Sequence, residues 1–167
     1  DDPGTSLSNP LVRKAVSLAI DRAGIAKNVL HGTAEPWGNY WAPYMLGYKH
    51  REPDPYDPDE ARRLLAEAGY PDGFDTYFNY PNTQELAAQA VIACLRGVGI
   101  RAEARPYDLG TWYEKYCDDK FNGMSYTFLP NWGGTYYPDK VLADAELIGA
   151  GTPISRNIPE VREAFDK

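Results

Sequence analysis

The order of strand-like and helix-like segments between residues 74 and 129 restricts the fold of this chain most strongly. Strand-like segments, with apolar residues on one face, occupy residues 74–80, 100–107 and 124–129. Helix-like segments lie between them, at residues 83–98 and 108–116. Because β-α-β units join parallel strands by right-handed crossovers, this order predicts an α/β fold with a mostly parallel β-α-β-α-β sheet and flanking helices.

Polar residues mark the starts of further helices. Asn9 and Asp57 each precede a proline, which suits the first helical position because its missing N–H would be unpaired there. Asp21 opens a shorter helix, and Glu60, three residues after Asp57, completes a variant of the capping box. Asp57 and Asp59 as metal ligands are the alternative, but no glycine-containing calcium loop surrounds them, so capping is favoured.

Residues 35–56 interrupt this pattern. They show no periodicity and hold six aromatic residues among four prolines. A long structureless loop in a compact domain is usually functional or wrapped over a surface, and the aromatic content argues against disorder. Two more helices are predicted near residues 139–147 and 159–165, and residues 1–167 are predicted to form a single domain.

Charge and composition exclude several classes of protein. The chain has 17 Lys+Arg against 24 Asp+Glu, a net charge of −7, which argues against nucleic acid as a partner. No run approaches the roughly 18 apolar residues of a membrane span, and the sequence from Asp1 to Gly4 is not a signal peptide. Two cysteines and two histidines leave little material for a Cys/His zinc site. We therefore expect neither a metal nor a cofactor.

The enzyme motifs that the sequence offers do not survive inspection. The stretch from Gly97 to Ala102 fits the dinucleotide pattern G-x-G-x-x-A, but that pattern must follow a strand and open a helix. Here it ends a helix and leads into a strand, so a helix end and tight turn is the better interpretation. His31 and His50 have no neighbouring nucleophile, which favours surface or capping roles. We expect the chain not to be an enzyme.

The remaining polar and thiol groups have ordinary interpretations. Cys94 lies on the apolar side of its helix, which favours a buried structural thiol. A disulfide between Cys94 and Cys117 stays open, because it depends on a distance that a sequence does not contain. Asp118 and Asp119, next to Lys120, are typical of a solvated helix end.

The predicted sheet itself indicates where a ligand would bind. In an open parallel sheet, ligands bind beyond the carboxyl ends of the strands, which here are residues 80–82, 107–108 and 131–132. Helix N-termini near Thr83 and Asp108 would offer unpaired N–H groups at the same place. Trp132 is the strongest candidate, because Gly133 and Gly134 after it permit close backbone approach. The alternative is that Trp132 plugs the core under a glycine turn.

The chain also resembles a known family, the family 5 extracellular solute-binding proteins of the peptide- and nickel-binding type. The resemblance rests on ordered motifs from residue 9 to about residue 140. They are a V-R-x-A-x-x-x-A-I-D-R helix at residues 12–22, a G-x-A-x-P turn at 32–36, a Y-D-P-x-x-A-x-x-L-L-x-E-A-G-Y segment at 56–70, an L-x-x-x-G-I helix end at 95–100, and Trp132 before the Pro138-Asp139 turn.

The resemblance implies a fold, a role and a place in the cell. Members have two lobes with ligand held between them, in the type II periplasmic-binding-protein fold, and this chain resembles most of the second large lobe. Its partners would then be a small-molecule or peptide ligand, the missing first lobe and an ABC permease. The protein would lie in the periplasm or outside the cell, and the missing signal peptide would reflect where the fragment was cut.

The resemblance also implies which residues contact ligand. In peptide-binding members the tryptophan matched by Trp132 lies at the cleft, and an Asp three residues later pairs with the α-amino group of the peptide. Here that residue is Thr135, whose hydroxyl cannot supply a charge-assisted bond worth about 1.5–3 kcal/mol. Trp112 and Lys120 fall where oligopeptide binders place a cleft tryptophan and a basic residue.

Together these arguments give one set of candidate ligand-binding residues and one class of ligand. The aromatic content favours a ligand with stackable or ring surfaces, such as a sugar or a modified peptide, over a peptide with a free α-amino group. The candidate residues are Tyr80, Asn82, Trp112, Lys120, Trp132, Gly133, Gly134, Thr135 and Tyr136.

Two other functions stay open at the level of sequence. The first is a ligand-sensing module that signals to a membrane receptor. A neighbouring permease and ATPase locus would favour transport, and its absence would favour sensing. The second is an enzyme of the doubly wound class, which would need a nucleophile–base pair that the motif search does not find.

Overall fold

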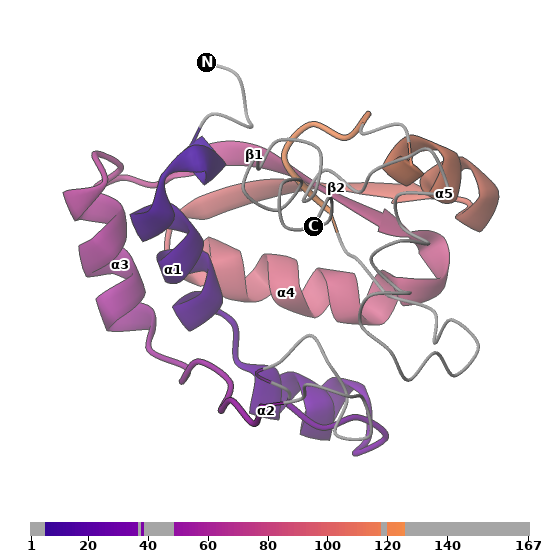
Figure 1. The fold of residues 1–167 in the computed structure, drawn as a ribbon, viewed down its shortest axis with the longest axis horizontal. Coiled ribbons are helices and arrows are strands. Elements are labelled where there is room, and N and C mark those ends of the chain that lie inside the picture. Colours follow the sequence, from indigo (N-terminus) through magenta and orange to yellow (C-terminus); the bar gives the residue numbers. More distant parts are fainter. Residues whose placement is uncertain (1–5, 37, 39–48, 118–119, 126–167) are drawn as a thin grey trace, which may run out of the picture.

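The three described strands form one parallel sheet with helices around it (Figure 1). The computed structural model describes residues 6–36, 38, 49–117 and 120–125. The helices are η1 (Ser6–Ser8), α1 (Pro10–Ala19), α2 (Arg22–Gly24), η2 (Ile25–Val29), α3 (Pro58–Glu67), η3 (Asn82–Gln84), α4 (Glu85–Gly97) and α5 (Leu109–Cys117). The strands are β1 (Phe74–Pro81), β2 (Ile100–Tyr107) and β3 (Met124–Ser125).

The strand order is β2-β1-β3, and both pairings are parallel. Strand β1 pairs with β2 along its whole length, from Phe74 opposite Ile100 to Pro81 opposite Tyr107. On its other side it pairs with β3, with Asn79 opposite Ser125. The β-α-β-α-β order predicted from the sequence is therefore confirmed for the described strands. The rest of the predicted third strand, residues 126–129, and the helices predicted at residues 139–147 and 159–165 lie outside the described residues.

The hydrophobic core lies on one side of the sheet, where Figure 1 shows α1, α3 and α4. Alternation along β1 turns Phe74, Phe78 and Tyr80 towards this side. They share the core with Ile92 and Leu95 of α4 and with apolar residues of α1, α3 and β2. Helix α5 lies beyond the end of β2, on the side to which the strands point (Figure 1).

The predicted helix caps are all present. The side chains of Asn9, Asp21 and Asp57 each accept a hydrogen bond from a backbone N–H two or three residues later, at 2.9, 2.8 and 3.0 Å. The capping box at Asp57 is only half formed, because its backbone N–H donates to the carbonyl oxygen of Leu18 at 2.9 Å. The side chain of Glu60 is left to bind Arg63.

The glycine pattern of residues 97–102 is a turn between α4 and β2, as the sequence predicts. Gly99 has φ +94° and Gly73, just before β1, has φ +73°, so both backbones lie in the left-handed region that glycine adopts readily. A Cβ atom on Gly73 would lie only 1.8 Å from the carbonyl oxygen of Gly99. This contact between two backbones sets the distance between the starts of the paired strands β1 and β2.

Asp54 fastens the segment before α3 to α1. Its carboxylate accepts hydrogen bonds from Lys14 Nζ at 2.7 Å and Ser17 Oγ at 2.6 Å. The guanidinium of Arg22 in turn donates to Ser17 Oγ at 3.0 Å. The bond from Lys14, followed by that from Ser17, lowers the pKa of Asp54 below its ordinary value of 3.8.

Replacing Gly73 should test the close approach of the two strand starts. Gly73→Ala adds a left-handed strain of about 1–2 kcal/mol and an overlap costing about 1–3 kcal/mol more. Gly69→Ala is the matched control, because Gly69 has φ +93° but open space around its Cβ position. Urea unfolding should show a clearly larger loss for Gly73→Ala, and equal losses would contradict the contact.

Replacing Asp54 should produce a pH-dependent loss of stability. A carboxylate with a lowered pKa stabilises the fold above its ordinary pKa, and the stabilisation is lost as the pH falls through the folded value. Asp54→Asn should therefore cost about 1 kcal/mol at pH 7, and the difference from wild type should shrink below pH 3.8. Urea unfolding between pH 7 and pH 3 measures it, with the exposed Asp59→Asn as control. A difference that stays constant with pH would rule out the proposed cause.

Candidate ligand-binding edge

The carboxyl ends of the parallel strands β1 and β2 meet at one edge of the sheet, and the described part of β3 runs towards the same edge. Strand β1 ends at Pro81, β2 ends at Tyr107, and β3 is described as far as Ser125. Because ligands of open parallel sheets bind beyond this edge, it is the candidate site in the described part of the chain. Residues 81 and 107 are also paired with each other across the two strands.

A buried asparagine ties the three strands together just below this edge. Asn79 is 1% exposed. Its Nδ2 donates to the carbonyl oxygens of Asn122 and Met124, both at 2.9 Å. Its Oδ1 accepts from the hydroxyl of Tyr107 at 3.3 Å. Both amide hydrogens and the side-chain carbonyl are therefore bonded, as a buried polar group requires.

Aromatic rings pack beside Asn79 on the side of α5. The rings of Trp112 and Tyr116 stack with centroids 5.0 Å apart and planes 10° apart. Phe121 lies 6.2 Å from Trp112 and 5.5 Å from Tyr107, so it links the helix to β2. The ammonium of Lys115 lies 5.7 Å from the Tyr107 ring centroid, within cation–π range. This aromatic cluster of Tyr107, Trp112, Tyr116 and Phe121 fixes α5 at the edge.

The structure places Tyr80 and Trp112, two of the predicted ligand-binding residues, inside the molecule. They are 1% and 2% exposed. The Tyr80 ring belongs to the core, and its hydroxyl donates to Glu85 Oε1 and accepts from Gln89 Nε2, both at 3.2 Å. Burial, with the Glu85 contact, raises the pKa of Tyr80 above 10. Neither ring has a free face in this structure, so both support the edge from within.

The expectation of unpaired N–H groups at the start of α5 is corrected by the structure. The carboxylate of Asp108 accepts a hydrogen bond from the backbone N–H of Thr111 at 3.0 Å. Hydrogen bonds from Thr111 lower the pKa of Asp108, so a negative charge already occupies this helix end. After β1 the chain passes through η3 before α4 begins at Glu85, which adds a second carboxylate in that helix's first turn. An acidic cap satisfies the helix dipole and discourages an anionic ligand there.

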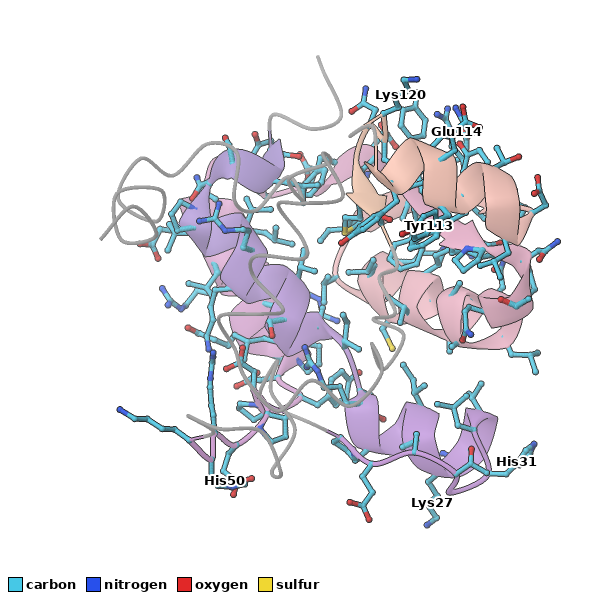
Figure 2. The ribbon with its side chains drawn as sticks, turned by 45° about the vertical axis from the view of Figure 1, so that its right-hand side comes forward. Lys27, His31, His50, Tyr113, Glu114 and Lys120 are labelled. Atoms are coloured by element: carbon cyan, nitrogen blue, oxygen red, sulfur yellow. The ribbon has the colours of Figure 1, made fainter. Side chains whose placement is uncertain are left out.

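The other predicted ligand-binding residues divide into exposed and undescribed ones. Asn82 is exposed directly after β1, and Lys120 is exposed after α5. Figure 2 shows Lys120 and Glu114 at the outside of the molecule. Trp132, Gly133, Gly134, Thr135 and Tyr136 lie outside the described residues, as do most of the aromatic residues predicted for the loop at 35–56, and Asp118 and Asp119.

Sequence reasoning missed Asn79 and Phe121. Asparagine is uncommon inside strands, so its position in the middle of a buried strand segment was an available signal for Asn79. Phe121 had no such signal, because it follows a helix in an irregular segment. Cys94 is a free thiol and only half-buried, which corrects the expectation of a buried one.

The described residues contain no cluster of three or more His, Cys, Asp or Glu side chains able to hold a metal ion. Figure 2 shows His31 and His50 on separate segments at the outside of the molecule. The Nε2 atom of His50 lies 2.7 Å from Glu52 Oε1.

None of the helices in the described ranges has the length and apolar character needed to cross a membrane.

Comparison with known proteins agrees with the resemblance read from the sequence. A family model described as "Bacterial extracellular solute-binding proteins, family 5 Middle" matches residues 4–146. The chain belongs to this family. The glutathione-binding protein GsiB of Escherichia coli (strain K12) is 37% identical over 105 residues, which cover 61% of this chain and 20% of GsiB.

Solved structures of the family share the fold. The ABC transporter-associated periplasmic binding protein DppA from Helicobacter pylori, in complex with peptide STSA, has a TM-score of 0.67 at 30% identity, covering 71% of this chain and 23% of that one. NikA from Brucella suis, in complex with Fe(III)-EDTA, has a TM-score of 0.74 over 95% of this chain and 35% of NikA. Its 24% identity supports the fold alone. The chain spans between 20% and 35% of the length of these three relatives.

Removing the Tyr80 hydroxyl should weaken the fold, because the bonds to Glu85 and Gln89 join β1 to the first turns of α4. Tyr80→Phe should lower the free energy of unfolding by about 1 kcal/mol, as measured by urea titration. Tyr56→Phe is the control, since Tyr56 is 53% exposed and should change stability by less than about 0.5 kcal/mol. Equal effects of the two substitutions would contradict the assigned hydrogen bonds.

Proposed function

We propose that the protein carrying this chain is the solute-binding component of an ABC import system. It would capture a small solute between two lobes outside the cytoplasmic membrane and deliver it to a permease, without catalysing a reaction. The match to the solute-binding family over residues 4–146 carries this proposal. The likeness to DppA, a binding protein with its peptide in place, supports it at the level of fold.

The geometry of the sheet supports a binding role at one edge. The parallel strands β1 and β2 end together, and β3 runs beside β1 in the same direction. The buried Asn79 and the aromatic cluster hold these strands. A rigid edge of this kind suits a binding protein, because pre-organised contacts reduce the entropy lost when a ligand binds.

We propose two groups of ligand contacts. Asn82 and Lys120 are exposed polar side chains, one beyond β1 and the other beyond α5. The second group, Trp132, Gly133, Gly134, Thr135 and Tyr136, follows β3 in the sequence. Trp132 would offer a ring on which a ligand can stack, and the two glycines would permit close approach of the backbone. Tyr80 and Trp112 would act beneath these contacts, as packing groups.

The proposed ligand class is a short or modified peptide, with a sugar as the second choice. The printed names of relatives include a glutathione-binding protein and a peptide complex. Thr135 stands where peptide-binding members carry a carboxylate, which disfavours a ligand with a free α-amino group at that point. Asp108 and Glu85 place negative charge at the starts of α5 and α4, which disfavours a strongly anionic ligand there.

A thermal-shift screen of the whole protein that carries this chain tests the proposal. The probes are reduced glutathione, the tetrapeptide Ser-Thr-Ser-Ala, a disaccharide and Fe(III)-EDTA. A probe at 100 times its Kd should stabilise the fold by about 2.7 kcal/mol. Deleting the gene should also abolish uptake of the stabilising probe by the cells.

Substitution of Trp132 tests the assigned contacts in the same assay. Trp132→Ala should weaken binding of the stabilising probe by about 2 kcal/mol or more, as expected of a central aromatic contact. Tyr56→Ala, at an exposed aromatic residue on the segment before α3, should leave binding unchanged. A screen without any stabilising probe would count against the function, and a Trp132→Ala protein that binds normally would count against the site.

A further inference from the structure

We propose that Asn79 is the positioning residue that sets the register of β3 on β1, and thereby the height at which residues 122–125 lie below the proposed ligand-binding edge. This inference rests on the proposed function for its meaning, since the edge matters only if ligand binds there. The contacts that carry it lie entirely within the described residues.

Strand β3 pairs with β1 at two positions in the described part of the chain, Phe78 with Met124 and Asn79 with Ser125. The register of this pairing matters, because a slip of one residue would move every side chain of β3 to the opposite face of the sheet.

The side chain of Asn79 adds two hydrogen bonds to the pairing of β1 with β3. Its two amide hydrogens are used on two carbonyl oxygens that flank Gly123, those of Asn122 and Met124, both at 2.9 Å. A slipped strand would present a different set of backbone groups to the amide. Since Asn79 is buried, a donor left unpaired by a slip would not find water, so the native register is favoured.

The close approach of Gly123 to the backbone of β1 favours the same register. It has φ +84°, and a Cβ atom there would lie 2.7 Å from the carbonyl oxygen of Tyr77. The backbone of the turn therefore lies directly against β1, and only glycine permits this approach. The amide of Asn79 and the bare backbone of Gly123 together place residues 122–125 at one height along β1.

The acceptor side of Asn79 has a different role. Its Oδ1 accepts from the Tyr107 hydroxyl at 3.3 Å, a longer contact that comes from the end of β2. This bond satisfies the amide oxygen, while the two shorter bonds to β3 already fix the orientation of the amide. Tyr107 is also fixed by Phe121, with ring centroids 5.5 Å apart. Removing the hydroxyl would leave both bonds to β3 in place.

Hydrogen–deuterium exchange on the whole protein without ligand tests the register directly. Asn79→Leu removes the hydrogen bonds and keeps the number of side-chain heavy atoms, and Asn79→Asp keeps the shape but sets carboxylate oxygens against two carbonyl oxygens. Both should speed exchange of the amides at residues 122–125 by about tenfold or more, with α4 unchanged. Tyr107→Phe should change exchange there by less than about threefold.

A variant of the core on the opposite side of the sheet serves as control. Ile92→Val lowers stability through a lost methyl group on α4 and touches none of the bonds of Asn79. It should leave the exchange of residues 122–125 at the wild-type rate. The proposal is overturned if exchange of these residues is unchanged in Asn79→Leu, or if Ile92→Val accelerates it equally.

Binding of reduced glutathione gives a readout that a purely structural role would not move. At a temperature where all variants are fully folded, Asn79→Leu should weaken glutathione binding by about tenfold or more, and Ile92→Val by less than about twofold. Normal binding by folded Asn79→Leu overturns the positioning role. If wild type binds none of the four probes, the proposed function fails, and the exchange measurement still decides the register.

Discussion

The parallel pairing of β1 with β2 is the interaction on which the rest of this structure depends. Eight consecutive residues of β1 face eight of β2, and both strands begin where the backbones of Gly73 and Gly99 meet. This pairing needs a crossover, which α4 supplies, and the crossover covers one face of the sheet with the apolar core. The opposite face remains available for α5 and for the aromatic cluster. Direction and layering thus follow from a single pairing of two strands.

Most of the fold was predictable because it is written in local patterns. Asn9, Asp21 and Asp57 cap helices where the sequence places them, and β1 and β2 lie where alternation predicts strands. These features depend on neighbours within a few residues, so the sequence alone contains them. The motif order from residue 9 onwards also predicted the family that the comparisons then showed.

The candidate site was less predictable because its geometry depends on distant contacts. Tyr80 lies at a strand end, and Trp112 falls where oligopeptide binders place a cleft tryptophan, so both were predicted to contact ligand, yet both rings are buried. Tyr116 and Phe121 pack against Trp112. Phe121 follows the helix and lies outside its periodic pattern, so the sequence did not indicate this contact. Asp108 likewise caps α5 with its own carboxylate, so the helix start does not offer the free N–H groups that strand order alone suggested. The proposed ligand contacts are therefore those of side chains at the surface of the edge.

Along β1, the face that carries Asn79 changes from exposed to buried. At its beginning, Arg101 and Asp75 form an ion pair with side chains 52% and 80% exposed, and near its end Asn79 is sealed from water. Dissolved salt screens the first contact and hardly reaches the second. The two ends of this face of β1 therefore respond differently to the salt concentration. At high ionic strength the attraction between Arg101 and Asp75 would weaken, while the hydrogen bonds of Asn79 would keep their strength.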